Sequence, residues 1–154
     1  MRSEAVLTDA ISAAPARAPR HLWIVGVVTL LWNGVGAFDY LMTQTKNEAY
    51  MSAFTPEQLD YFYGFPSWVV AAWALAVWGG VLGSLLLLFR KQLAVPVLLV
   101  SLLSMVATTI YNFVLTDGMA VMGGEGATFS AVIFVVALGL WLYARAMRGR
   151  GVLV

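Results

Sequence analysis

An aspartate inside the first long apolar segment is the strongest chemical candidate in this sequence. Asp39 lies near one end of the apolar run 22–42. A charged side chain at the centre of a membrane-spanning helix costs about 2.5–3.5 kcal/mol, so such residues usually face the protein interior or water. Asp39 fits either a carboxylate that binds a ligand or a proton, or a structural acid that ties helices together or lies at the level of the lipid headgroups. If its side chain turns inward, we expect Asn112 or Tyr111 as its hydrogen-bond partner.

A polar stripe on the third apolar segment supplies further candidates. Its hydroxyl and amide side chains recur at intervals of three and four residues, which places them on one helix face. Counted from the segment ends, this stripe reaches the depth of Asp39. Such faces ordinarily serve helix packing, and a polar path toward the loops is the alternative. The stripe is Ser101, Ser104, Thr108, Asn112 and Thr116, and the whole candidate cluster is Asn33, Asp39, Tyr40, Thr108, Tyr111 and Asn112.

Four apolar runs must position these residues. Hydrophobic residues make up 61 % of the chain and charged residues 11 %, more apolar surface than a soluble protein of this size could bury. Continuous runs of this length match helices that cross a hydrocarbon core of about 30 Å. We predict an all-α integral membrane protein, a four-helix transmembrane bundle over residues 21–148, with tails at 1–20 and 149–154. The predicted spans are 22–42, 66–89, 93–115 and 127–147.

The basic residues are distributed unevenly around these spans. Eight of the nine Lys and Arg residues flank one side, and Lys46 lies on the other. Basic residues near span ends are retained in the cytoplasm, so we expect both termini there. The basic residues fall into separate short segments, which argues against a nucleic-acid surface. The eight are Arg2, Arg17, Arg20, Arg90, Lys91, Arg145, Arg148 and Arg150.

The outer loops differ from each other. Residues 55–58 (TPEQ) match a capping box with proline at the first helical position, and Gly64 ends the pattern. We expect a short amphipathic helix on the membrane surface, acting either as a brace or as a lid over a pocket. The glycine-rich stretch 118–126 is expected to be a flexible outer loop.

Small residues on the second span predict close helix contact. Gly79 pairs with Gly83, and Gly80 pairs with Ser84, at the four-residue spacing that lets two helix backbones approach. The partner could be a helix of this chain or of a second copy. A homodimer or a larger membrane complex is therefore an open alternative, with lipid covering the remaining surface.

The residue types present also limit the chemistry. The chain has no cysteine and one histidine, so we expect no metal site and no cofactor. No nucleophile paired with a base is apparent, and we expect no enzymatic activity. The first functional hypothesis is an accessory or partner-binding membrane protein. The alternative is a small transporter or ligand-binding protein that uses a polar site around Asp39 and Asn112.

Several short motifs also carry a family resemblance. The chain resembles a family of small proteobacterial inner-membrane proteins of unknown function, some of which are labelled sugar transporters. The resemblance spans most of residues 21–150 and implies a four-span protein of the bacterial inner membrane. It supplies no catalytic or binding residues. Its motifs are 32–45 (WNGVGAFDYLMTQT), 54–58 (FTPEQ), 65–66 (FP), 113–115 (FVL) and 121–124 (VMGG).

Overall fold

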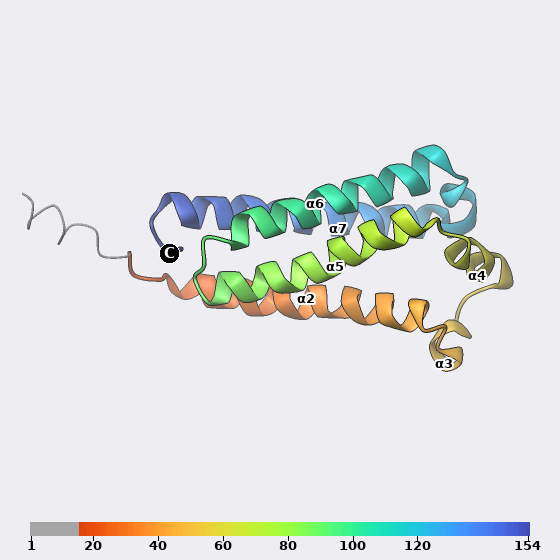
Figure 1. The fold of residues 1–154 in the computed structure, drawn as a ribbon, viewed down its shortest axis with the longest axis horizontal. Helices are drawn as coiled ribbons and strands as arrows, with labels where there is room; N and C mark the ends of the chain where they lie inside the picture. The colour runs from red at the N-terminus through yellow and green to blue at the C-terminus, as the bar shows by residue number, and fades with distance from the viewer. Residues whose placement is uncertain (1–15) are drawn as a thin grey trace, which may run out of the picture.

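The structure, a computed structural model, describes residues 16–154 and is helical throughout that range apart from short turns (Figure 1). The predicted all-α fold is therefore confirmed for the described residues. A π-helical turn, η1, continues α6, and two short helices lie in the first long loop. The elements are α2 (Arg20–Gln44), α3 (Glu48–Met51), α4 (Pro56–Tyr63), α5 (Ser67–Leu88), α6 (Ala94–Ile110), η1 (Tyr111–Leu115) and α7 (Gly118–Gly149).

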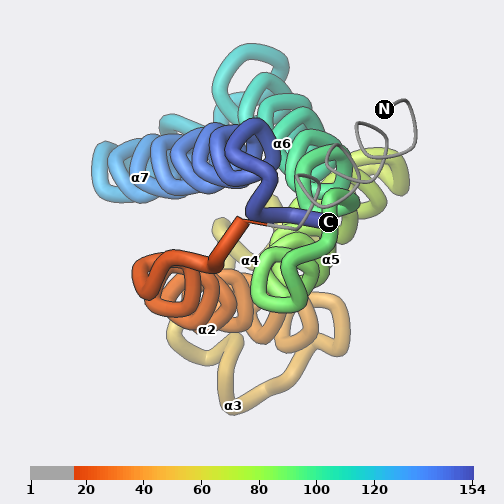
Figure 2. Tube along the Cα trace, turned by 90° about the vertical axis from the view of Figure 1, so that its left-hand side faces the viewer, coloured from red at the N-terminus to blue at the C-terminus, as the bar shows by residue number. Residues whose placement is uncertain are grey.

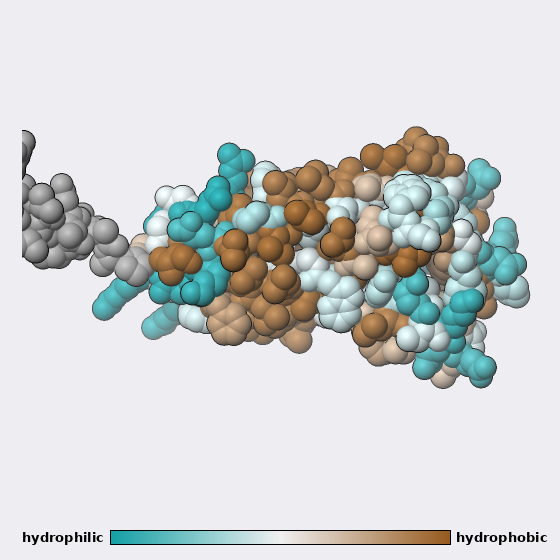
Figure 3. All heavy atoms as spheres, in the orientation of Figure 1, coloured by the Kyte–Doolittle hydropathy of each residue, from teal (hydrophilic) through white to brown (hydrophobic). Residues whose placement is uncertain are grey.

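The surface of the bundle is that of a membrane protein. Within the described residues, four helices are long and apolar enough to cross a membrane: α2, α5, α6 together with η1, and α7. On the face shown in Figure 3, apolar residues cover much of the middle of the molecule, and polar residues collect at its two ends. Large apolar side chains such as Leu31, Val135 and Val114 remain more than two-thirds exposed. The chain is accordingly a multi-pass membrane protein.

The four long helices follow one another around the bundle. α2 packs on α5, α5 on α6, and α6 on α7, whereas α2 and α7 make at most marginal contact. Figure 2 shows this order, with α2 and α7 at its two ends, and we call the boundary between these two helices the seam. We call the end that holds Ala16 and the C-terminus the terminal end, and the end that holds α3 and α4 the loop end (Figure 1).

The small residues of α5 are used within this chain. A Cβ at Gly80 would collide with the side chain of Asn33 on α2, and one at Gly83 with Leu98 on α6. Gly79 lies against Ser101 of α6, where a Cβ would come within 3.0 Å of the Ser101 Cβ. Ser84 is fully buried. The small residues on one face of α5 therefore allow α2 to pack closely, and those on the next face allow α6 to do so. Both of these partner helices belong to the same chain.

The terminal end is filled by a cluster of buried apolar side chains. Leu22, Leu87, Met147 and Leu153 are at most 2 % exposed and belong to one apolar cluster. Arg90 fixes the C-terminal segment there: its Nε donates to the Val152 carbonyl at 2.9 Å. The residues predicted as a tail at 149–154 thus fold back into the core. Most of the predicted N-terminal tail, residues 1–15, lies outside the described residues.

The fourth span begins earlier than the sequence predicts. α7 starts at Gly118, so the expectation of a flexible loop over 118–126 is wrong. Gln58 of α4 donates to the Val121 carbonyl at 3.5 Å, and contact of α7 with α4 and α6 outweighs the helix cost of about 1 kcal/mol per glycine. Gly123 still interrupts the helix with φ 68° and ψ −175°, a conformation open to glycine almost alone.

We expect Gly80→Ala to lower the free energy of unfolding by about 1–3 kcal/mol, the usual cost of overpacking. The added methyl would push Asn33 off its hydrogen bonds to Thr29 and Ser84. The matched control is Gly34→Ala on α2, where a Cβ meets nothing within 4 Å. That variant should be neutral or slightly stabilising. Thermal unfolding in detergent compares the two, and equal melting temperatures would contradict the packing described.

Candidate functional site

A cavity of about 510 Å³ lies between the long helices in the loop-end half of the bundle. All four long helices contribute to its wall, and α3, α4 and the segments beside them contribute Tyr50, Phe54, Phe62 and Phe65. Its surface combines aromatic rings with a set of polar side chains from three of the long helices and α3. The polar set is Asn33, Asp39, Thr43, Tyr50, Ser101, Thr108, Thr109, Asn112 and Ser130.

The six residues of the predicted cluster divide into two groups. Asn33, Asp39, Thr108 and Asn112 all line the cavity. Tyr40 is not among its lining residues and instead stacks edge-on against Trp73, with ring centroids 5.1 Å apart. Tyr111 likewise packs outside the lining, at 5.7 Å from Phe65 and 5.5 Å from Trp68. These two tyrosines therefore support the wall behind the cavity surface.

Asp39 is held by a residue of the first loop. The Tyr50 hydroxyl donates to Asp39 Oδ1 at 2.7 Å, so the expected partners Asn112 and Tyr111 are wrong. Lys46, with φ 50°, reverses the chain after α2, and Asn47 caps α3 by accepting from the Tyr50 N–H at 3.1 Å. This turn brings α3 back beside the end of α2, where Tyr50 also meets Phe38 edge-on at 5.7 Å.

Asn112 is held by the second short helix. The Tyr61 hydroxyl donates to Asn112 Oδ1 at 3.0 Å and also bonds the Thr116 hydroxyl at 2.7 Å. Asn112 sits in η1, and the Thr116 hydroxyl, which donates to Tyr61, also lies 3.0 Å from the Tyr111 carbonyl, five residues back. π-turns of this kind often occur at functional sites. Here the π-turn lies where Tyr61 of α4 forms its hydrogen bond with Asn112.

The predicted capping box at the start of α4 is present. Thr55 accepts from the Gln58 N–H at 3.3 Å, and the Gln58 side chain accepts from the Thr55 N–H at 3.1 Å. Gly64 ends the helix as predicted. Because Phe62 lines the cavity while Tyr61 bonds Asn112, α4 covers the cavity at the loop end. Of the two predicted roles, this geometry favours a lid over a brace.

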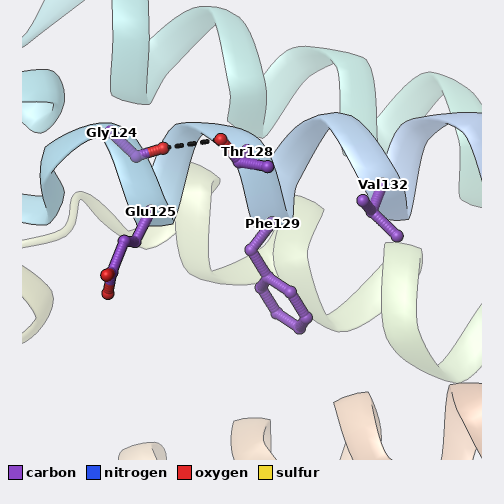
Figure 4. Close-up of a pocket in the computed structure, with 5 residues that line it drawn as sticks. All are labelled: Gly124, Glu125, Thr128, Phe129 and Val132. Carbon is purple, nitrogen blue, oxygen red and sulfur yellow. Dashed lines mark hydrogen bonds between the residues drawn. The ribbon is translucent and has the colours of Figure 1, made fainter.

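The seam between α2 and α7 is bridged by two aromatic rings. Trp32 and Phe129 have centroids 6.2 Å apart, and both line the cavity. Phe129 also lines a shallow groove of about 420 Å³ along α7, next to Glu125 and Val132. Figure 4 shows Phe129 and Glu125 on the side of α7 turned away from α6. A single side chain thus separates the internal cavity from the outer groove.

A second polar group lies deeper, toward the terminal end. Asn33 Nδ2 donates to the Ser84 hydroxyl at 3.2 Å and to the Thr29 carbonyl at 2.8 Å. Ser84 in turn donates to the Thr29 hydroxyl at 3.3 Å. These bonds join α2 to α5 at the point where Gly80 brings the helices together. Their geometry is that of helix association, because they join two long helices where these are closest.

Two functional candidates, Tyr50 and Tyr61, were not identified from the sequence. Both lie between residues 45 and 66, where helical periodicity ends and long-range partners depend on the path of the chain. The N-cap residues Asn47 and Thr55 were the available signal, because two capped helices in one loop bring it back over the bundle end. The seven lining aromatics were also missed as a group: Trp32, Tyr50, Phe54, Phe62, Phe65, Trp73 and Phe129.

The Tyr50 phenol gives a test of its pairing with Asp39. Burial, then the hydrogen bond to Asp39 and the charge of that carboxylate, raise the pKa of Tyr50 from 10.0 to about 12. A folded-state pKa above the unfolded value means that the protonated phenol stabilises the fold below about pH 10. That contribution is lost as the pH rises through about 12.

We expect Asp39→Asn to lower the pKa of Tyr50 without restoring its ordinary value, since burial, the largest cause, remains. Near-ultraviolet absorbance of the phenolate, taken as the difference from Tyr50→Phe at each pH, measures the midpoint. The same midpoint in the wild type and in Asp39→Asn would show that the hydrogen bond is not formed.

No family model, no curated protein and no solved structure matches this chain. Its function has to be inferred from the cavity, the side chains that line it and the packed end opposite.

Proposed function

We propose that the protein binds a small amphiphilic molecule in the loop-end cavity. The observation that carries the proposal is the cavity itself: about 510 Å³ of space between helices that close tightly elsewhere. Ligand sites typically have 300–1,000 Å³, mostly apolar walls and a few placed polar groups. The lining meets that description, since seven aromatic residues accompany the polar set.

The two ends of the bundle support binding from the loop side. At the terminal end, Leu22, Leu87 and Met147 are buried with the C-terminal residues in one apolar cluster. At the loop end, the cover consists of two short helices that are fastened by tyrosine hydroxyls. Opening the loop end requires few contacts to break. Transport would additionally require the terminal apolar cluster to separate, so binding is the function that this conformation supports.

The proposed orientation places the cavity on the outer side of a bacterial inner membrane. Arg17, Arg20, Arg90 and Lys91 lie at the terminal end with the C-terminal arginines, and Lys46 lies at the loop end. By the positive-inside rule the terminal end is cytoplasmic. We expect a reporter fused after Val154 to be active if it requires the cytoplasm and inactive if it requires the periplasm. Activity of a periplasm-specific reporter at that position would contradict the proposed orientation.

Filling the cavity should remove its ligand. Ala137 of α7 lines the cavity, whereas Ala131 on the same helix is exposed and does not. We expect Ala137→Phe to lose a small-molecule adduct that native mass spectrometry detects on gently extracted wild-type protein. Ala131→Phe should keep the adduct. Unfolding temperatures of both variants verify that each is folded, and an adduct that survives in folded Ala137→Phe would contradict binding in this cavity.

The accessory role expected from the sequence is tested by the same measurement. A protein partner or a second copy would appear as a fixed additional mass, independent of the residue at position 137. α7 is the least buried of the four candidate spans, with 11 % of its most apolar stretch buried. Lipid is the expected cover of its exposed surface, and the homodimer or larger complex stays a prediction.

A further inference from the structure

The charge of the cavity is carried by Asp39. Among the lining residues, all of which belong to the described part of the chain, Asp39 is the one acidic side chain, and none is basic. Tyr50 donates a hydrogen bond to Oδ1 at 2.7 Å, but a hydroxyl does not cancel a charge. A partly buried carboxylate without a cationic partner is stabilised by any cation that enters. The cavity therefore favours cationic over anionic ligands.

The aromatic walls favour the same sign of charge. The face of an aromatic ring is negative and attracts ammonium groups within about 6 Å, an effect strengthened when water is excluded. Trp73 is the central example, because it lines the cavity and is fixed by edge-on contacts with Tyr40 at 5.1 Å and Phe65 at 6.4 Å. Rings held in this way also give a flat apolar surface for the body of a ligand.

Three hydroxyl groups of the wall, those of Ser101, Thr108 and Thr109, already donate their protons to backbone carbonyls. Ser101 donates to the Ala76 carbonyl at 2.5 Å, and Thr108 and Thr109 donate to the Met105 carbonyl at 2.8 and 2.9 Å. These groups therefore offer the cavity mainly lone pairs, which accept hydrogen bonds. A ligand that donates finds acceptors in these three hydroxyls and in Asp39, whereas a carboxylate or a phosphate meets the negative charge of Asp39.

We propose that the ligand is an organic cation, an ammonium group on an apolar body, with the ammonium at Asp39 and the body against Trp73 and the neighbouring rings. This inference rests on the proposed function, since it names the class of molecule that occupies the same cavity. Neutral and anionic amphiphiles of the same size are the alternatives that the experiment separates.

The test compares three probes that share one skeleton: 2-phenylethylammonium, 2-phenylethanol and phenylacetate. Binding is measured by equilibrium dialysis against wild-type protein in phosphatidylcholine nanodiscs, with empty nanodiscs subtracted. We expect the ammonium to bind about tenfold or more tightly than the alcohol, because one ion contact in a dry site is worth about that factor. Phenylacetate should bind more weakly than either.

Asp39→Asn should remove the preference: about a tenfold loss for the ammonium and less than about a twofold change for the alcohol. The matched control is Asp60→Asn, the same chemical change on the exposed face of α4 away from the cavity, which should leave both affinities unchanged. Equal binding of ammonium and alcohol to the wild type overturns the inference, and that comparison needs no variant to fold. A preference that survives in Asp39→Asn also overturns it.

Tighter binding of phenylacetate, or no binding of any probe, overturns the inference as well. The proposed function is judged separately by the adduct on the gently extracted protein and its loss in Ala137→Phe. A cavity that binds the alcohol as well as the ammonium would leave that function standing and assign it a neutral ligand.

Discussion

The distribution of side-chain size along α5 is the constraint on which the rest of the structure depends. From Gly79 toward the terminal end, glycine and serine let α2 and α6 approach α5 on two adjacent faces. In the other half of the same helix, Trp73 and Val69 stand at the inner surface, and helices that are close at Gly80 leave space between them. Since membrane helices associate mainly through close packing, one helix determines both where the bundle closes and where it stays hollow.

Polar side chains inside the apolar helices form two groups, one where the helices pack closely and one around the cavity. In the close-packed half, Asn33 and Ser84 bond to each other and to Thr29, which satisfies them within the helix pair. In the hollow half, Asp39 and Asn112 receive hydrogen bonds from α3 and α4. The first group stabilises helix association. The second group is bonded to the two short helices of the first loop and not to another long helix.

The helix α4, which covers the cavity, is stabilised by its own capping and contacts the bundle through a few side chains. A capping box and a proline at the first helical position stabilise α4 as a unit. Its attachment to the bundle rests on Tyr61, on Gln58 and on edge-on ring contacts such as Phe54–Phe62 at 5.7 Å. The seam between α2 and α7, bridged by Trp32 and Phe129, is a second place where the wall is thin.

The sequence by itself determined the number and approximate limits of the spans, because the cost of placing polar backbone in lipid leaves apolar runs few alternatives to helices. It also singled out Asp39 and Asn112, since polar side chains in such runs stand out by their energetic cost. Only the tertiary structure decided what these residues contact. Tyr50 and Tyr61 reach them through turns at Lys46 and Gly64, and the direction of a turn depends on packing across the whole loop. The helical residues on either side of Gly123 within 118–126 have the same explanation: α7 contacts α4 and α6 there, and local glycine propensity is what a sequence pattern measures.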